Sequence, residues 1–317
     1  MKKVLKVAGR VLLGILILLI IFWIGVFFYN RIMLLKEKTL IRNQQISQLV
    51  EVDGHNMSIY ESGEGVHTLV FMAGSGAPTP IIDYKSFATR FEDDYRIVII
   101  EKFGYGFSEE FDGARDVETR VNQNRKALKA AGLTGSYVLC PHSYSGLEAV
   151  YWAQNYPDEV EAIIGLDMAV PRAYDMYTDK IIESVKKAAS LNRVFRNLGI
   201  VRLFVGGTIP EEFTEEEKKI ITAVICKSYG NKTAANESDF IISDLDVIDS
   251  KGIPDIPTLL IISDGTITDG WIDFEMDYAS KLSDVTTVQL NCRHSVFDYE
   301  PDSCEKSMRE FLDKAER

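Results

Sequence analysis

A run of 19 uncharged residues near the N-terminus, from Val11 to Tyr29, most strongly limits how this chain of 317 residues can fold. A helix of that length would reach roughly 29 Å, which is close to the thickness of the hydrocarbon layer of a bilayer. A helix at the surface of a soluble domain would keep a polar face, and this run has none. Lipid offers no partners for free backbone polar groups, so a spanning segment must be helical. The sequence therefore predicts one transmembrane helix that contacts the lipid bilayer through residues 11–29.

The residues on either side of the run favour an uncleaved anchor over a cleaved signal peptide. No small-residue cleavage site follows it, because the next residues are Asn30, Arg31 and Ile32. Four basic residues precede the run and four follow it closely, so the positive charges hardly distinguish the two orientations. The very short N-terminus favours a cytoplasmic location for Lys2 and Lys3. We therefore expect a single-pass membrane protein with a signal anchor and with its body outside the cytoplasm.

Charge is distributed unevenly along the chain. The whole sequence has 35 Lys and Arg against 47 Asp and Glu, whereas residues 1–42 have eight basic residues and one acid. The remainder therefore carries 27 basic and 46 acidic residues, a net charge of -19. A body this acidic would repel a phosphate backbone, so we expect no nucleic-acid partner. The oligomeric state is not predicted by these features.

The sequence offers no site for a metal ion or a cofactor. The four cysteines have no CxxC spacing and no histidine at the spacing of a metal ligand. Gly74 and Gly76 could begin a dinucleotide-binding loop, but Thr79 stands where its third glycine belongs. We therefore expect no metal and no cofactor.

From residue 46 onward, short apolar runs typical of strands alternate with helical segments. The predicted strands lie at residues 50–60, 68–71, 96–100, 137–140, 162–166, 258–262 and 286–290. Helices between strands predict a mostly parallel sheet with helices on both faces. Between residues 171 and 255 helix follows helix, as in 177–190 and 215–228, which predicts a helical cap inserted into the sheet domain.

Four segments follow from these patterns. Residues 1–30 form the basic flank and the anchor, and residues 31–45 form a linker. Residues 46–170 and 256–317 form the α/β core, and residues 171–255 form the cap.

The ten residues from Tyr137 to Gly146 (YVLCPHSYSG) predict a strand, a tight turn and a helix, with Ser143 at the apex of the turn. Such a nucleophile elbow exposes the serine hydroxyl but strains the backbone, so the positions two residues away must be small. Pro141 and Ser145 occupy the positions where glycine is usual. Both side chains are small, as the turn requires, but proline departs from the usual motif. The N-terminus of the following helix would stabilise a developing negative charge.

Other segments accompany this elbow in a definite order. Upstream, a strand ends in the glycine loop that contains Gly74 and Ser75, and a second strand leads into a Gly-Tyr-Gly-Phe-Ser sequence. Downstream, one strand ends at Asp264 and the next leads to His294. With these motifs in this order, residues 46–317 resemble the α/β-hydrolase superfamily of serine hydrolases with a helical cap.

The resemblance implies catalytic roles for several residues. Ser143 would be the nucleophile and His294 the general base, and the backbone N–H groups of Tyr144 and Ser75 would form the oxyanion hole. The order Ser, acid, His is that of this superfamily. Serine at the nucleophile position argues against haloalkane dehalogenase and epoxide hydrolase chemistry, which needs an aspartate there.

Elimination also favours His294 as the base. A serine hydroxyl is a poor nucleophile until a base removes its proton. Of the four histidines, His142 adjoins Ser143 in a turn that makes neighbours point apart, and His55 and His67 lie near the first strands. His142 is then expected to serve packing.

The acid of the triad has three candidates. Asp264 follows the strand after the cap, where most relatives place this residue, although its spacing from Pro257 is slightly short. Asp269 lies in the same loop. Asp167 ends the preceding strand, where some lipases carry their acid. We take Asp264 as the first choice and keep Asp167 and Asp269 as alternatives.

The sequence therefore predicts a membrane-anchored serine hydrolase that acts on a carboxylic ester, with a small-molecule acyl compound as substrate. An amidase or aminopeptidase-like hydrolase is an alternative. A catalytically silent binding or sensing module is another, because Pro141, Ser145 and Ala73 depart from the usual pattern.

Overall fold

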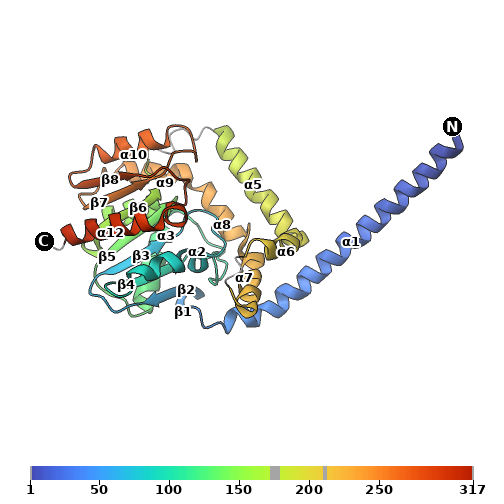
Figure 1. Ribbon diagram of the computed structural model, residues 1–317, viewed down its shortest axis with the longest axis horizontal. Helices are drawn as coiled ribbons and strands as arrows, with labels where there is room; N and C mark the ends of the chain where they lie inside the picture. The colour runs from blue at the N-terminus through green and yellow to red at the C-terminus, as the bar shows by residue number, and fades with distance from the viewer. Residues whose placement is uncertain (1, 172–178, 210–212, 316–317) are drawn as a thin grey trace.

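A sheet of eight strands forms the centre of the molecule (Figure 1). Its strands are β1 (Gln48–Val52), β2 (His55–Ser62), β3 (Thr68–Met72), β4 (Arg96–Glu101), β5 (Tyr137–Ser143), β6 (Val160–Met168), β7 (Thr258–Ile262) and β8 (Val285–Gln289). Their order across the sheet is β1-β2-β4-β3-β5-β6-β7-β8, and all neighbours from β4 to β8 are parallel. β2 pairs antiparallel with β1 and β4. The computed structural model describes residues 2–171, 179–209 and 213–315.

Helices cover both faces of this sheet. The helices of the core are α2 (Pro80–Ala88), α3 (Val117–Ala130), α4 (Ser145–Asn155), α10 (Trp271–Ala279), α11 (Val296–Tyr299) and α12 (Pro301–Ala315). One buried apolar cluster joins α3, α4 and α10 to the sheet, and a second joins α2, α11 and α12 to it. The central strands β3 and β7 are buried at every position, which explains their continuous apolar sequences. The predicted α/β architecture is therefore confirmed.

Five helices follow one another between β6 and β7. They are α5 (Asp179–Leu198), α6 (Ile200–Phe204), α7 (Glu215–Ser228), α8 (Lys232–Asn236) and α9 (Ile241–Asp249). The 3-10 helices η4 (Val205–Gly207) and η5 (Glu237–Asp239) lie among them, and η1 (Thr89–Phe91) and η2 (Pro157–Glu159) lie in the core. α7 has the predicted bounds because Thr214 and Glu217 form a capping box at its start. The predicted start of α5 at residue 177 lies outside the described residues.

A single helix of 41 residues, α1 (Lys2–Arg42), extends away from the body (Figure 1). By length and composition it can cross a membrane, with a mean hydropathy of 3.1 in its most apolar stretch, of which 6% is buried. The helix does not end with the apolar run. Residues 31–42, expected as part of a linker, continue it without a break because they include no glycine or proline.

The second half of α1 packs on the cap helices α5 and α7. Val26, Asn30, Glu37 and Ile41 are buried there, at spacings that place them on one face of the helix. Glu37 accepts two hydrogen bonds of 2.7 Å from the guanidinium of Arg202, which is the bidentate arrangement of a strong ion pair. Arg202 Nε also donates to Asn30 Oδ1 at 3.0 Å. The end of α1 is therefore fixed to the cap.

Candidate active site

Ser143 lies at the carboxyl end of β5, where the chain turns into α4. Its φ is 53°, a left-handed backbone conformation that is uncommon for residues other than glycine. The register between β5 and β6 shifts between His142 and Ser143, and Ser143 O accepts a 2.7 Å hydrogen bond from Ala169 N. Such strain persists only where the surroundings enforce it, and it gathers at functional sites. The geometry is that of the tight turn predicted from the sequence.

The surroundings of the turn explain why Ser145 can replace glycine. The Ser145 side chain is fully buried, accepts a 3.0 Å hydrogen bond from His142 N and lies 2.7 Å from Met72 O. Its hydroxyl therefore joins the turn to the end of β3. Gly146 cannot be replaced in this way, because a Cβ at this position would lie 2.2 Å from Ala169 O.

His294 is paired with the aspartate at the end of β6. Its Nδ1 lies 2.6 Å from Oδ2 of Asp167, whose side chain is fully buried. The other oxygen of Asp167 accepts hydrogen bonds from Ser263 N at 2.8 Å and from Trp271 Nε1 at 2.9 Å. Asp167 also has a left-handed backbone, with φ 50°. The carboxylate is therefore held in one orientation, toward the imidazole.

The expectation that Asp264 would lie beside His294 is not met. β7 ends at Ile262, so Ser263 reaches Asp167 and the following residue turns outward. Asp264 Oδ1 instead accepts from Thr266 Oγ1 at 2.7 Å and from Thr266 N at 3.0 Å, and these hydrogen bonds lower the pKa of Asp264. The side chain serves a local turn.

Asp269, the other candidate in this loop, is exposed and is not paired with His294. The slightly short spacing between Pro257 and Asp264 was a sign in the sequence against Asp264.

His142 connects the two halves of the site. Its ring centroid lies 4.6 Å from that of His294, and its Nε2 lies 3.3 Å from His294 O. Burial, reinforced by the neighbouring His294, lowers the pKa of His142 to about 3, so this ring is neutral and packs against Tyr84 and Phe297. Ser143 and His294 therefore lie at the same edge of the sheet. In the part of the chain that the structure describes, no hydrogen bond joins the Ser143 hydroxyl to His294, and such bonds often tighten only with substrate.

The glycine loop after β3 approaches the serine closely. A Cβ at Gly74 would lie 2.8 Å from Ser143 Cβ and 3.2 Å from His142 O, so only glycine fits. This places the backbone of Gly74 and Ser75 beside the turn, while Tyr144 is the N-cap residue of α4. Two backbone segments thus flank Ser143.

A cluster of buried charges lies behind this site. We call it the buried charge cluster; it consists of Lys102, Arg115, Arg120, Glu148, Glu237 and Asp244, all nearly or fully buried. Lys102 Nζ lies 2.7 Å from Glu148, and Arg120 bridges Glu148 and Asp244 at 3.0 Å each. Arg115 lies 3.2 Å from Glu237. Three positive charges face three negative ones, which offsets the cost of burying them.

The buried charge cluster joins the cap to the catalytic edge. Glu237 and Asp244 belong to η5 and α9, whereas the other members belong to the core. Tyr105 Oη donates to Glu237 at 2.7 Å and accepts from Gly76 N at 2.9 Å, and Tyr144 Oη donates to Asp244 at 3.1 Å. Burial opposes ionisation of Glu237, but Lys102, Arg120 and Arg115 hold its pKa at about 2. No local pattern in the sequence indicates this cluster, because its members are up to 142 positions apart.

Removing one cation from the buried charge cluster should destabilise the fold strongly. We expect Arg120→Met to lower the free energy of unfolding by about 3–5 kcal/mol, because Glu148 and Asp244 would lose a buried partner. Arg90→Met is the matched control. Its partners Asp302 and Glu305 are 90% and 25% exposed and remain accessible to water, so the loss should stay below about 1 kcal/mol. Denaturant unfolding of both variants in detergent measures the difference, and equal losses would contradict this account of the cluster.

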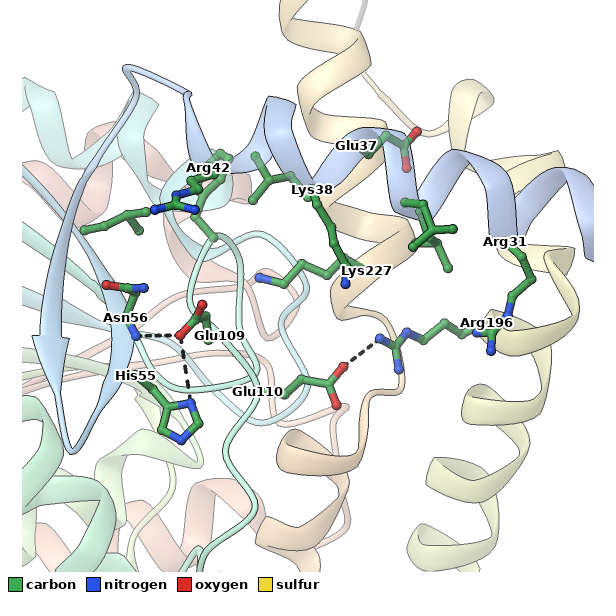
Figure 2. Close-up of a pocket in the computed structure, with 15 residues that line it drawn as sticks. Arg31, Glu37, Lys38, Arg42, His55, Asn56, Glu109, Glu110, Arg196 and Lys227 are labelled. Carbon is green, nitrogen blue, oxygen red and sulfur yellow. Dashed lines mark hydrogen bonds and ion pairs between the residues drawn. The ribbon is translucent and has the colours of Figure 1, made fainter.

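A separate cleft of about 1130 Å³ lies between α1 and the body, and neither Ser143 nor His294 lines it (Figure 2). Arg31, Lys38 and Arg196 line it together with Lys227, whose pKa is lowered to about 8 by burial. Arg196 bonds Glu110 at 2.7 Å across it. No group of His, Cys, Asp or Glu side chains suited to a metal ion occurs among the described residues.

Comparisons with known proteins agree with the architecture. No family model matches the chain. The uncharacterized protein YbdG of Bacillus subtilis is 32% identical over 329 residues, an alignment that covers 99% of each chain. The epoxide hydrolase VrEH1 from Vigna radiata superimposes with a TM-score of 0.67 at 17% identity, over 84% of this chain and 98% of that one. The enol-lactonase from Burkholderia xenovorans superimposes with a TM-score of 0.60 at 17% identity, over 84% and 99%. At these identities the structural matches show a shared fold.

Proposed function

Because the chain belongs to the α/β-hydrolase superfamily, we propose that it is a membrane-anchored serine hydrolase that cleaves carboxylic esters through Ser143, His294 and Asp167. The observation that carries the proposal is the 2.6 Å contact between His294 Nδ1 and the buried Asp167 carboxylate, beside a serine with a strained backbone. An imidazole, an acid and a serine in this arrangement make up the machinery of acyl transfer.

The proposed reaction has two steps. Asp167 accepts a hydrogen bond from His294 Nδ1–H, which leaves Nε2 free to take the proton of the Ser143 hydroxyl. The serine oxygen then bonds to the ester carbonyl carbon, the alcohol leaves with the proton returned by His294, and an acyl-enzyme remains. In the second step a water molecule gives a proton to His294 and its oxygen bonds to the acyl carbon. The bond between that carbon and the Ser143 oxygen then breaks, His294 returns the proton to the serine oxygen, and the carboxylic acid leaves.

The backbone N–H groups of Tyr144 and Ser75 are the proposed oxyanion hole. Tyr144 is the N-cap residue of α4, so its N–H lies at the positive end of a helix dipole. Ser75 follows Gly74, whose backbone approaches Ser143 closely. Tyr105 holds the other side of this loop through Gly76 N, so the donors are fixed before the substrate arrives, which is what makes such donors effective.

Serine at the turn supports an ester rather than an epoxide as substrate. The structural neighbours include epoxide hydrolases and an enol-lactonase. A serine nucleophile activated by a histidine fits the acyl chemistry of a lactonase, and epoxide opening needs an aspartate at this position. The proposal therefore names a small-molecule carboxylic ester as the substrate.

The proposed anchor is α1, with residues 11–29 in the bilayer. Its length and hydropathy support this placement. We propose that Lys2 and Lys3 lie on the cytoplasmic side of the membrane and the body on the other side.

Ester turnover by the purified full-length chain in detergent tests the proposal. With a series of p-nitrophenyl esters of increasing acyl length, we expect hydrolysis that begins with a burst of about one nitrophenolate per enzyme, because the acyl-enzyme forms faster than it hydrolyses. Folded protein that hydrolyses none of the series above the rate in buffer would contradict the proposed function. Turnover of amides in preference to esters would change the substrate class only.

Gly74→Ala should impair catalysis while the protein remains folded. The added methyl group would lie 2.8 Å from Ser143 Cβ, so the loop must move away and displace the oxyanion donor of Ser75. We expect kcat to fall by about 100- to 1000-fold, the usual effect of losing one such donor. Gly207→Ala is the control, since a Cβ there meets nothing within 4 Å. An unchanged kcat for Gly74→Ala would argue against the proposed oxyanion loop.

A further inference from the structure

The junction between α5 and α6 touches α1 where the apolar run ends. Gly199 forms this junction, and a Cβ there would lie 2.7 Å from Asn30 Cβ and 3.1 Å from Val26 O. Val26 and Asn30 are both buried, although most side chains of the apolar run are exposed. The cap therefore reaches the segment that is proposed to lie in the membrane.

The depth of this contact can be placed along the helix axis. Val26 precedes Tyr29, the last residue of the apolar run, by three positions, which corresponds to about 4.5 Å. Interfacial helices bury their apolar face about 5–10 Å into the boundary between headgroups and acyl chains. The junction would thus lie at the level of the membrane interface when α1 spans the bilayer.

The orientation of α5 fits the same placement. In Figure 1, α5 runs crosswise to α1 and borders it at the end toward α6. A helix that crosses a spanning helix in this way lies along the membrane surface.

Exposed apolar side chains line α5 and α6 on either side of Gly199, the residue that meets the end of the apolar run. We call them the apolar stripe; its members are Leu191, Val194, Leu198, Leu203 and Phe204, all exposed. The first three follow the spacing of one helix face, and Phe204 is 68% exposed. An apolar patch of this kind beside a membrane segment marks an interaction surface.

Basic residues accompany the apolar stripe. Between residues 182 and 198, α5 has Lys186, Lys187, Arg193 and Arg196 against the single acid Glu183. Arg196 pairs with Glu110, whereas Lys186 and Lys187 are exposed and pair with Asp239 and Glu183 at the surface. Arg31 of α1 and Arg196 line the same cleft (Figure 2). A helix with an apolar face and basic residues is typical of attachment to an anionic lipid surface.

The ion pair between Glu37 and Arg202 makes this arrangement rigid. Both side chains are less than a tenth exposed, and Arg202 belongs to α6 itself. This ion pair fixes the position of the cap along the axis of α1.

We propose that the apolar stripe lies in the interface of the bilayer that α1 spans, so that the cap docks on an anionic lipid surface. This inference rests on the proposed insertion of α1. The contact with the lipid is continuous with the anchor, and it holds the cap of the hydrolase against the membrane. The alternative is that a second copy of the chain covers the apolar stripe.

Fluorescence quenching in lipid nanodiscs tests the proposal on the full chain. The four native cysteines are free and buried, so a single introduced cysteine can be labelled with an environment-sensitive NBD dye. Phe204→Cys and Leu191→Cys probe the apolar stripe. Val66→Cys, a 94% exposed site in the turn before β3, is the control on the body, and Leu18→Cys reports on the anchor.

The nanodiscs contain phosphatidylcholine and phosphatidylglycerol, with a doxyl group near the headgroup or deep in the acyl chain. We expect the shallow doxyl lipid to quench dye at Phe204→Cys and Leu191→Cys several-fold more than dye at Val66→Cys, and the deep one to quench Leu18→Cys most. Adding Leu198→Asp and Leu203→Asp to Leu191→Cys should reduce its quenching several-fold and leave Leu18→Cys unchanged.

The outcomes separate the two proposals. Quenching at Leu18→Cys without quenching at the apolar stripe would overturn the docked cap and leave the anchor and the hydrolase standing. Absence of quenching at Leu18→Cys would overturn the insertion of α1, and the docked cap with it, whatever the ester activity. In nanodiscs that hold two copies of the chain, the dyes at the apolar stripe could instead contact each other and show no quenching by lipid. That result would assign the apolar stripe to a dimer and overturn the proposal.

Discussion

Ser143→Ala should lower kcat for an ester substrate by about a million-fold, the usual consequence of losing the serine of such a triad. The hydroxyl of Ser143 is the atom that bonds to the acyl group in the proposed reaction, and alanine supplies none. The strained turn itself should persist, because its hydrogen bonds involve the Ser143 carbonyl and the Ser145 side chain. Steady-state ester hydrolysis and a thermal melt of the same preparation measure activity and folding together.

Ser145→Ala is the control for this change. It removes a serine hydroxyl two residues away in the same turn, where the hydroxyl bonds only backbone groups. We expect a loss of stability of about 1 kcal/mol from the missing hydrogen bonds and a kcat within an order of magnitude of the wild type. A Ser143→Ala protein that still turned over ester at a comparable rate would remove Ser143 from the mechanism.

Asp167→Asn should lower kcat by about 10,000-fold, as expected when the acid of a triad is replaced by an amide. The carboxylate fixes the Nδ1–H tautomer of His294, whereas an asparagine amide can donate to Nδ1 and leave the proton on the wrong nitrogen. The buried hydrogen bonds of Asp167 to Ser263 N and Trp271 Nε1 can be kept by the amide oxygen, so the fold should tolerate the change.

Asp264→Asn and Asp269→Asn are the matched comparisons, because both residues lie in the loop that follows β7. The Asp264 carboxylate accepts hydrogen bonds from Thr266, and an amide oxygen can accept the same hydrogen bonds. We expect both variants to keep kcat within a few-fold of the wild type. A large loss for Asp264→Asn together with an active Asp167→Asn would reverse the assignment of the acid.

Much of the core could be predicted because its signals are local. Buried parallel strands need continuous apolar sequences, and the runs around Leu69, Ile99 and Leu260 are of this kind. The carboxyl ends of parallel strands meet at one edge of the sheet. This is why Ser143 and His294, 151 positions apart, could be expected to lie close together from motif order alone.

The remaining features depend on packing between distant segments. Which aspartate pairs with His294 depends on where β7 ends. A difference of one residue in that end point determines whether Ser263 or Asp264 faces the end of β6. Residues 31–42 were expected as part of a linker, but they pack on the cap, where Glu37 forms an ion pair with Arg202. No local pattern indicates a partner 165 positions away.

Covalent labelling of the folded full-length protein with a fluorophosphonate, followed by peptide mapping, tests the central claim most directly. This reagent phosphonylates a serine only where a neighbouring base has activated it. We predict one adduct, on the peptide that contains Ser143, and its loss in His294→Ala. Folded wild-type protein that remains unlabelled, or that carries the adduct on another serine, would contradict the account.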